Sequence, residues 1–406
     1  MQDNEKKPAL RFKGFTDPWE QRKVGELLTE RNEQAPMSDE YPLMAFIANE
    51  GVAPKGERYD RSALVNGTAS KLYKKTKFGD FIYSSNNLET GSIGLNKYGK
   101  ASISPVYSIF KPTGIADSDF LGRRLIRKDF INEMVKWRQG VIYGQWRIHE
   151  SDFIKIEVAV PTVEEQCKLG LLLDNLDTLI TLHQRKYEKL VNIKKSMLDK
   201  MFPQNGVSVP EIRFKGFTDP WEQRKISELA EKTYGGGTPT TSNEAFWNGN
   251  IPWIQSSDIV DGKLMGVEPR KYITQTGLNS SATQLVPKNS IAIITRVGVG
   301  KLAYMPFSYS TSQDFLSLSK LNTEPFFTVY ACYKKLQSEL NTVQGTSIKG
   351  ITKDELLAKT ISVPVYSEQK QIGSFFAQLD TLITLHQRKL EKLQNIKKSC
   401  LEKMFV

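Results

Sequence analysis

The sequence predicts an α+β protein in which two mixed α/β globules are separated by a pair of long antiparallel coiled-coil helices, with an internal pseudo-twofold repeat. Two observations predict this architecture. Residues 11–23 and 213–225 are both RFKGFTDPWEQRK, and residues 176–202 recur at 379–405 with four differences in 27 positions. Between these matched segments the two halves share almost no sequence. Identical ends with divergent middles indicate one scaffold that presents two different surfaces.

The repeat also gives the expected domain limits. We expect a first globule at residues 1–160, a first long helix at 161–202, a linker at 203–212, a second globule at 213–363 and a second long helix at 364–406. The linker, PQNGVSVPEI, contains two prolines, a glycine and an asparagine, which end a helix and turn the chain. The hydrophobic content of 39% is enough for more than one core.

Each globule alternates short β-branched or aromatic segments with turns rich in Gly, Asn and Ser, which is typical of twisted strands. The expected strands lie at residues 77–86, 99–110 and 153–160 in the first globule, and at 250–260, 289–305 and 359–365 in the second. Helices are expected at 118–137 and 323–341. Both globules are therefore predicted to be mixed α/β.

The repeated segments predict long amphipathic helices. They contain no Pro or Gly and are rich in residues that favour helix. Positions spaced alternately by four and three residues form an apolar seam. The seam comprises Leu176, Ile180, His183, Tyr187, Leu190 and Met197 in the first copy, and Leu379, Ile383, His386, Leu390, Leu393 and Cys400 in the second. The helical pattern starts near Glu164 and Glu368, so each helix covers about 40 residues, or roughly 60 Å. Antiparallel pairing of the two seams would bury both and place one globule at each end.

Polar residues interrupt the seam at matching positions in the two copies. His183 and His386 could bind a metal or sense pH, but histidines packed within a coiled coil are the favoured interpretation. Lys194 and Lys397 also fall on the seam. The other basic residues of these helices fit a solvated face, with contacts to phosphate or to partner subunits as the alternative.

The charge balance indicates a polyanionic partner. Fifty-six Lys and Arg against 45 Asp and Glu give a formal net charge of +11, which favours nucleic acid first and an anionic membrane surface second. No segment approaches ~18 consecutive apolar residues, so no membrane-spanning helix is expected. The N-terminal MQDNEKKPAL lacks the apolar run of a secretory signal. The three cysteines are far apart and suggest neither a disulfide framework nor a zinc site. We therefore expect a cytoplasmic protein.

Both globules contain side chains suited to DNA. Arg pairs bidentately with guanine, Asn and Gln pair with adenine, and Ser and Thr bond either, while Lys contacts phosphates. The candidate DNA contacts of the first globule are Arg58, Lys71, Lys74, Lys75, Ser84, Asn86, Asn87, Gln145 and Arg147. Those of the second are Thr238, Thr240, Gln255, Ser256, Ser257, Arg296, Gln313, Ser347 and Lys349. An ordinary surface or turn role is the alternative for each of them.

The sequence shows no recognisable catalytic or metal motif. The segment RVGVGKL at 296–302 approaches a P-loop but lacks its first Gly and its final Ser or Thr. Residues 235–239 are expected to form a flexible turn, since no dinucleotide-binding fingerprint surrounds them. His149 is the one histidine outside the seam, and no nucleophile motif accompanies it. We predict no catalytic residue and no metal ligand, with a metal-dependent nuclease as the less favoured alternative.

Several motifs together are specific to a known family. They are PWEQRK at the start of each globule, the VP…EQ element before each long helix, and the helices LDxLI…QRKxEKLxNIKKSxLxKMF. The second globule adds YGGGTPT (234–240), NIPWIQSSDI (250–259), LVPKNSIAIITR (285–296) and TSQDF (311–315). With these motifs the chain resembles, over essentially all of its length, the specificity subunit of type I restriction–modification systems. The second globule is similar to one class of target-recognition domain, and the first resembles a different class.

This resemblance implies a division of labour between subunits. Each globule would bind one half of a split, asymmetric double-stranded DNA target in the major groove, and the long helices would set the gap between the half-sites. Two methyltransferase (modification) subunits carrying S-adenosylmethionine would methylate adenine, and two restriction/translocase subunits would use ATP and Mg²⁺. The chain itself would hold no cofactor, perform no catalysis and contact no membrane.

Three alternatives stay open from the sequence. The same DNA-binding subunit could serve a methylation-only system without a restriction subunit. A free-standing nuclease or methyltransferase is the second alternative, and a structural coiled-coil adaptor without DNA contact is the third.

Overall fold

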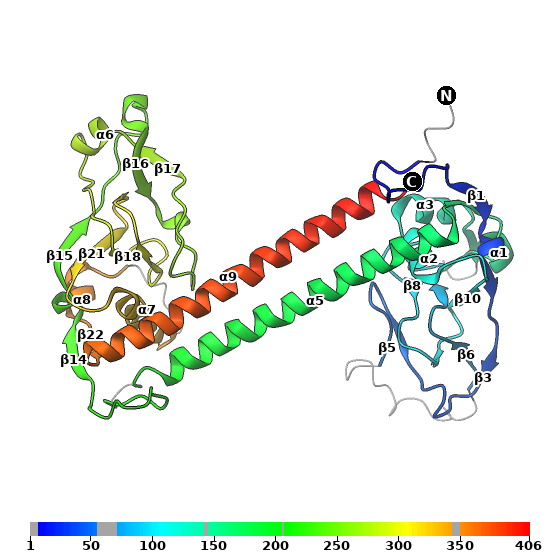
Figure 1. The fold of residues 1–406 in the computed structure, drawn as a ribbon, viewed down its shortest axis with the longest axis horizontal. Helices are drawn as coiled ribbons and strands as arrows, with labels where there is room; N and C mark the ends of the chain where they lie inside the picture. The colour runs from blue at the N-terminus through cyan, green and yellow to red at the C-terminus, as the bar shows by residue number, and fades with distance from the viewer. Residues whose placement is uncertain (1–6, 55–70, 142–144, 205–206, 343–349) are drawn as a thin grey trace. The chain divides into compact units, whose positions relative to one another are not determined.

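The structure is a computed structural model that describes residues 7–54, 71–141, 145–204, 207–342 and 350–406. The chain divides into two compact units: unit 1 contains residues 1–182 with 391–406, and unit 2 contains residues 183–390. The long helices α5 (Val163–Lys200) and α9 (Tyr366–Lys403) each contribute one segment to each unit (Figure 1). The predicted domain limits assign each helix to a domain of its own, whereas each compact unit contains a globule and segments of both helices.

Unit 1 contains a globule of short strands and helices that precedes α5. Its elements are β1 (Glu20–Lys23), α1 (Val24–Leu27), β2 (Leu28–Glu30), β3 (Gln34–Ala35), β4 (Ala45–Ile47), β5 (Gly51–Ala53), β6 (Tyr73–Thr76), β7 (Phe81–Tyr83), β8 (Ile93–Leu95), β9 (Ala101–Ile103), β10 (Ser108–Pro112), α2 (Ser118–Arg124), α3 (Lys128–Lys136), β11 (Gln139–Val141), β12 (Gln145–Arg147), α4 (Glu150–Phe153) and β13 (Glu157–Val160). The main sheet is antiparallel with the order β2-β10-β7-β8. Its core is aromatic, because Phe81, Tyr83 and Phe110 pack around Phe153 with ring centroids 4.7–6.0 Å apart.

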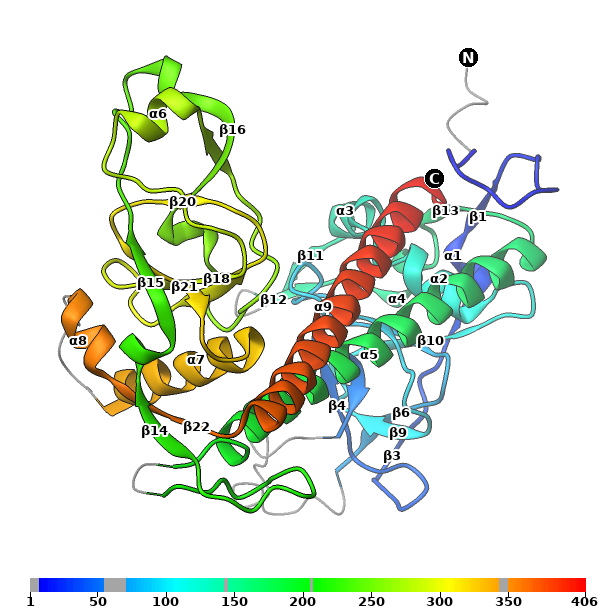
Figure 2. The ribbon, with the colours of Figure 1, turned by 60° about the vertical axis from the view of Figure 1, so that its left-hand side comes forward.

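Unit 2 contains a globule that precedes α9. Its elements are β14 (Glu222–Lys225), η6 (Ile226–Glu228), β15 (Ala230–Gly235), η7 (Glu244–Phe246), β16 (Trp247–Ile254), η8 (Ser256–Asp258), β17 (Lys271–Ile273), α6 (Gln275–Asn279), β18 (Ser290–Ile294), β19 (Leu302–Met305), β20 (Ser310–Thr311), β21 (Phe315–Leu321), α7 (Pro325–Thr342), α8 (Lys353–Ala358) and β22 (Thr360–Val363). The main sheet is antiparallel with the order β15-β21-β18-β19. Helix α7 packs against this sheet (Figure 2) and buries Phe327 and Tyr330 in a core with Ile291 and Ile293.

The two globules share one sheet arrangement although their sequences are unrelated. In each, the strand after the repeated EQRK strand lies at one edge and pairs with the last strand of the sheet, as β2 does with β10 and β15 with β21. The third strand in the sheet order then pairs with its successor in the chain, β7 with β8 and β18 with β19. The turns at residues 84–92 and 295–301 therefore occupy equivalent places in the two sheets.

The repeated motifs bind each other where each globule starts and ends. The identical EQRK strands β1 and β14 pair antiparallel with β13 and β22. Arg11 donates two hydrogen bonds of 2.7 Å to Glu165, and Arg213 donates bonds of 2.7 and 2.8 Å to Glu368. The glutamate side chains are 1% and 0% exposed. The RFKGFTDPWEQRK and VP…EQ motifs therefore form one structural unit, which explains why they recur together.

The ends of the repeated helices pack against the globules. Phe405, which follows α9, lies 6.1 Å from Trp19 and 5.6 Å from Phe120 between ring centroids in unit 1. Phe202, which follows α5, lies 6.0 Å from Trp221 in unit 2. Each tryptophan of the PWEQRK motif is thus buried against the phenylalanine that ends the other copy of the helix.

Helices α5 and α9 pack against each other in an antiparallel manner within each unit. Lys397 Nζ lies 2.5 Å from Asp177 Oδ1 in unit 1, and Lys194 Nζ lies 2.6 Å from Asp380 Oδ1 in unit 2. Each pair joins the first half of one helix to the second half of the other. All twelve seam residues predicted above are buried or half-buried, and both helices begin within two residues of the predicted start. The predicted α+β class is confirmed.

Three expected elements are each divided into two in the structure, one of them the expected strand at 289–305, which forms β18 and β19. The segment 118–137 forms α2 and α3 rather than one helix, because Arg127 is extended (φ −72°, ψ 149°) and starts a new helix. The break allows Phe130 and Met134 of α3 to enter the core of unit 1. The expected strand at 99–110 forms β9 and β10. Pro105 lies between them, and proline cannot donate to a strand ladder.

Candidate nucleic-acid interface

Four loops of unit 2 are joined by backbone hydrogen bonds. Gly237 N, after β15, donates to Thr311 O (2.8 Å). Ser312 N, after β20, donates to the last residue of β16 (2.9 Å). Thr295 N, after β18, donates to Asp314 O (2.7 Å). We refer to these loops as loop cluster 2, which comprises residues 236–240, 255–257, 295–300 and 311–314.

Loop cluster 2 brings together residues predicted from the sequence to contact DNA. It contains Thr238, Thr240, Gln255, Ser256, Ser257, Arg296 and Gln313. The hydroxyl of Thr238 donates to Gln313 Oε1 (2.7 Å), and both side chains are exposed. Arg296 is exposed in the turn between β18 and β19, where Gly298 and Gly300 have φ of 91° and 90°. Residues from four separate segments therefore form one polar surface.

Close packing explains the glycines at the start of loop cluster 2. A Cβ on Gly236 would lie 1.9 Å from Ser312 O and 2.3 Å from Thr311 Oγ1. A Cβ on Gly237 would lie 2.6 Å from Thr283 N. Any side chain at these positions would force the loops apart, so Gly236 and Gly237 act through tight packing, in contrast to the flexible turn expected from the sequence.

A cation and two tryptophans border loop cluster 2, and no sequence pattern predicts that they lie together. The indole N–H of Trp253 donates to Gly237 O (3.0 Å). The Trp247 ring packs edge-on against the Trp253 ring, with 5.2 Å between their centroids. Lys271 Nζ lies 5.8 Å from the centroid of each ring. Lys271 is exposed, so it adds a positive charge beside the polar surface.

A second set of loops gathers in unit 1. Asn86 Oδ1 accepts a hydrogen bond from Trp146 N (2.6 Å), and Ser85 Oγ accepts one from Ile148 N (3.0 Å). These bonds join the turn after β7 to the hairpin formed by β11 and β12. We refer to residues 84–87 and 145–147 as loop cluster 1, which contains the predicted residues Ser84, Asn86, Asn87, Gln145 and Arg147.

Burial removes three predicted residues from the set of DNA contacts. Lys75 is 3% exposed, and its ammonium donates to Pro36 O (2.5 Å) and Ser102 Oγ (2.9 Å). Lys74 and Ser84 are 7% and 5% exposed. Lys74 and Lys75 lie on β6, the middle strand of the sheet β3-β6-β9. The sequence could not reveal this burial, because lysines in a basic run normally face solvent.

The other predicted residues have varied positions. Lys71 precedes β6, is exposed and lies 5.8 Å from the ring of Tyr73. Arg58, Ser347 and Lys349 lie outside the described residues.

Trp146 is a candidate that sequence reasoning missed. It is 50% exposed, between Gln145 and Arg147 on β12. An exposed indole beside a cation can stack on a nucleobase, a contact worth about 1–3 kcal/mol per base. Arg147 is also exposed, and its Nη2 lies 3.6 Å from Glu150 Oε2. Burial alone would raise the pKa of Glu150, but the Ser108 hydroxyl and nearby cations hold that pKa below its usual value. Glu150 therefore stays charged and orients Arg147.

The two loop clusters lie at equivalent places in the shared sheet. Asn86 and Asn87 belong to the turn between β7 and β8, and Arg296 belongs to the turn between β18 and β19. The same framework thus presents amides in one globule and a guanidinium in the other. These groups favour adenine and guanine respectively.

Among the described residues, no set of three His, Cys, Asp or Glu side chains could hold a metal ion. Burial raises the pKa of the Cys332 thiol to about 12, which keeps it protonated and unreactive. None of the helices described is long and apolar enough to cross a membrane.

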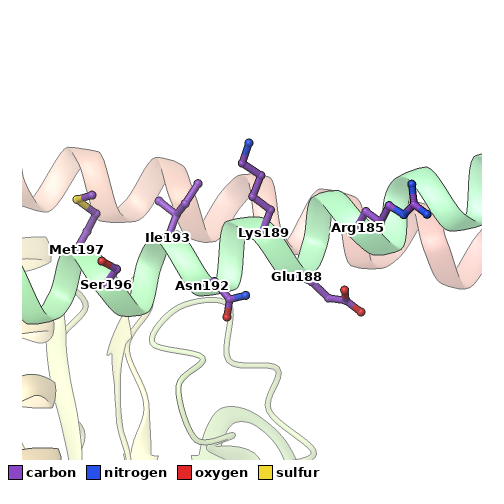
Figure 3. Close-up of a pocket in the computed structure, with 7 residues that line it drawn as sticks. All are labelled: Arg185, Glu188, Lys189, Asn192, Ile193, Ser196 and Met197. Carbon is purple, nitrogen blue, oxygen red and sulfur yellow. The ribbon is translucent and has the colours of Figure 1, made fainter. Parts of the chain in front are cut away.

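A set of surface residues on α5 recurs in the sequence of α9. A shallow groove on α5 is lined by residues of that helix alone. Lys189, Ile193 and Met197 project from the same side of the helix (Figure 3). The groove residues are Arg185, Glu188, Lys189, Asn192, Ile193, Ser196 and Met197. All except Met197 recur at the matching positions of α9. Leucines next to this segment are equally exposed in the two copies: Leu179 42%, Leu182 45%, Leu382 43% and Leu385 45%.

Comparison with known proteins assigns a class to the second half of the chain. Residues 218–395 match the family described as type I restriction modification DNA specificity domain. The match covers the globule of unit 2 and most of α9. This part of the chain is therefore similar to the DNA specificity domains of that family.

Curated relatives carry the same description. The type I restriction enzyme MjaIX specificity subunit of Methanocaldococcus jannaschii is 26% identical over 193 residues, which are 46% of this chain and 44% of the relative. The EcoR124I/EcoR124II specificity subunit of Escherichia coli is 30% identical over 169 residues, or 40% of this chain and 41% of the relative. Both alignments span less than half of the relative. The MjaVIII specificity subunit of M. jannaschii is 23% identical over 359 residues, which are 82% of this chain and 81% of the relative.

A solved structure supports the fold along the whole chain. The S subunit of a type I restriction–modification system from M. genitalium superposes with a TM-score of 0.61, at 14% identity, over 98% of this chain and 99% of that chain. The resemblance to type I specificity subunits is thus confirmed by the sequence matches, and the solved structure shows a similar fold.

Proposed function

We propose that this chain is a non-catalytic specificity subunit that binds a bipartite, asymmetric DNA target and directs partner subunits to it. The observation that carries the proposal is the presence of two globules with one sheet arrangement and unrelated loop clusters. A single framework with two different sets of polar side chains selects two different half-sites. A dimer of identical globules would instead favour a palindrome.

Exposed side chains of the loop clusters would select the bases. In unit 2 these are Arg296, with guanine as its preferred partner, and the hydrogen-bonded pair of Thr238 and Gln313. In unit 1 they are Asn87 and Arg147, with Trp146 available for stacking. Exposed lysines such as Lys71 and Lys271 would contact phosphates. Their contribution would weaken as salt concentration rises.

The helix pair would bind the catalytic partners. Because the exposed leucines and groove residues occur once on α5 and once on α9, the chain offers two equal sites for two methyltransferase subunits. These subunits would hold S-adenosylmethionine and methylate adenine. Two restriction/translocase subunits would add ATP- and Mg²⁺-dependent cleavage, and no cofactor would be bound by this chain.

Methylation mapping tests this proposal. The chain is co-expressed with a type I methyltransferase subunit from the same host, and methylated adenines are located by long-read sequencing. We expect a split motif with a fixed gap that is absent when the methyltransferase subunit is expressed alone. If both proteins are present and associated but no new motif forms, the chain is a structural adaptor. Nuclease or methyltransferase activity of the isolated chain would establish the enzyme alternative.

Reciprocal variants assign the half-sites. Arg296→Ala should relax one half-site by about 1–3 kcal/mol of discrimination and leave the other unchanged. Arg147→Ala should do the converse, so each variant is the control for the other. Uniform weakening over all sequences would show that the altered arginine contacts phosphate. Copurification of a restriction subunit separates a restriction system from a methylation-only system.

A further inference from the structure

Two equivalent ion pairs connect α5 and α9. Asp177 and Asp380 occupy the same position of the repeated helix, and so do Lys194 and Lys397. In unit 1, Lys397 Nζ lies 2.5 Å from Asp177 Oδ1. In unit 2, Lys194 Nζ lies 2.6 Å from Asp380 Oδ1. The aspartate of each copy is therefore bound by the lysine of the other copy.

The second oxygen of each aspartate binds the globule of its own unit. Arg123 Nη2 of α2 donates to Asp177 Oδ2 (2.8 Å). The hydroxyl of Tyr330 on α7 donates to Asp380 Oδ2 (2.5 Å). Different residues of unrelated globules thus make the same contact. One carboxylate in each unit joins both helices and the globule.

The environment makes these contacts selective for one register. The pair in unit 2 is nearly enclosed, with Lys194 11% and Asp380 16% exposed. Lys194 also donates to Gly262 O (3.0 Å) and lies 5.6 Å from the Tyr330 ring centroid. The pair in unit 1 is more open, since the side chains of Lys397 and Asp177 are 31% and 37% exposed. After a shift of one heptad, apolar seam residues would still pack against other apolar residues, but the buried Lys194 would lose its carboxylate partner, which is costly.

We propose that Asp177 and Asp380 are positioning residues, which fix the register of α5 against α9 and the orientation of each globule on its helices, so that the spacer length of the DNA target depends on them. This inference rests on the proposed function for its DNA readout. The register itself is a property of the folded chain and can be measured without DNA.

An apolar-seam variant tests the proposal without an unpaired charge. It combines Asp177→Leu, Asp380→Leu, Lys194→Met and Lys397→Met with Tyr330→Phe, because the Tyr330 hydroxyl donates to Asp380 and would otherwise be left buried without an acceptor. Replacement of buried ion pairs by apolar residues is usually neutral or stabilising, whereas register selectivity is lost. We expect thermal unfolding close to that of the unchanged chain. In methylation mapping, sites with an altered spacer should rise about tenfold or more while both half-sites stay the same.

A charge-swap variant gives a second test if the apolar-seam variant does not fold. Lys194→Asp with Asp380→Lys restores the pair in reverse, and the Tyr330 hydroxyl can accept from the new lysine. The corresponding swap in unit 1 would place a lysine against Arg123, so it is avoided. The double swap should keep a single spacer length, and Asp380→Lys alone should broaden it. A single spacer length in Asp380→Lys would overturn the proposal.

Controls and a DNA-independent readout complete the design. Lys398→Met with Glu402→Leu changes exposed residues of α9 and should leave the spacer unchanged. For the register, cysteines replace His183 and His386, whose Nδ1 atoms lie 2.8 Å apart, in a Cys167→Ser background. A short bifunctional thiol reagent should link them in the unchanged seam and less in the apolar-seam variant.

The outcomes separate the two proposals. A folded apolar-seam variant with the original spacer and full cross-linking would refute the register role. If the chain with its original seam produces no methylated motif but cross-linking follows the expected pattern, the proposed function fails and the register role stands.

Discussion

Loss of the buried arginine–glutamate pairs should be far more costly than loss of similar pairs on the surface. Arg11→Met removes both hydrogen bonds to Glu165, whose side chain is 1% exposed, and Arg213→Met does the same to Glu368, which is 0% exposed. Each change leaves a carboxylate inside the protein without its cation. Breaking a buried pair in this way costs about 3–5 kcal/mol.

The expected shift in melting temperature follows from the size of the units. Each compact unit contains about 200 residues, and for such sizes 1 kcal/mol changes the melting temperature by about 2–4 °C. Arg11→Met should therefore lower the melting of unit 1 by about 10 °C, and Arg213→Met should do the same to unit 2. Differential scanning calorimetry of the full chain measures both transitions.

Arg22→Met is the matched control for Arg11→Met. Arg22 pairs with Glu20 and Glu26, but these side chains are 36%, 67% and 47% exposed, and exposed pairs contribute about 0–1 kcal/mol. The control should therefore melt within a few degrees of the unchanged chain. Arg11→Met with Glu165→Met should recover most of the lost stability, because no unpaired charge remains. If Arg11→Met melts no lower than Arg22→Met, the two motifs do not stabilise each other as argued.

Three further predictions concern the helices and loop cluster 2. Inserting four residues into α5, about one turn or ~6 Å, should change the spacer length in methylation mapping; a change in half-site sequence would refute the spacer role of the helices. Burial and the adjacent His183 lower the pKa of His386 below its ordinary value of 6.5, so the unfolded chain binds that proton more tightly. The contribution of His386 to the stability of unit 2 should be complete above about pH 6.5 and fall at lower pH. Thermal melts from pH 8 to 5 should show that the melting temperature of the His386→Asn variant depends less on pH than that of the unchanged chain. An equal pH dependence in the variant and the unchanged chain would contradict the prediction. Gly236→Ala should lower the melting temperature and weaken binding to one half-site, because the new Cβ would lie 1.9 Å from Ser312 O. Gly235→Ala should do neither, since a Cβ at that position meets nothing within 4 Å. If the two variants have the same melting temperature and the same half-site binding, the loops move apart freely.

The long helices were predictable because their signals are local. The seam repeats every three or four residues without Pro or Gly, and the structure leaves every predicted seam residue buried or half-buried. The expected strands at 250–260 and 359–365 contain part of β16 and all of β22 for the same reason, since a β-branched or aromatic segment between turn residues favours a strand.

Tertiary context decided what the sequence could not predict. Lys75 is buried by the strands on both sides of β6, and nothing in its own segment reveals those neighbours. The exposure of Trp146 depends on a hairpin held by Asn86, about sixty residues earlier in the chain. The shared sheet order was also hidden, because many different sequences with alternating apolar residues can form one arrangement.

The antiparallel pairing of β1 with β13 and of β14 with β22 makes each globule a closed insertion. The chain leaves each globule beside the point where it arrived, across a ladder of four residue pairs that starts from the same EQRK sequence in both copies. Whatever lies between those strands can vary in length and sequence without altering where the following helix begins. Under the proposed function, recognition and assembly can therefore diversify separately, and a globule exchanged at these strands would bring a new half-site to an unchanged helix pair.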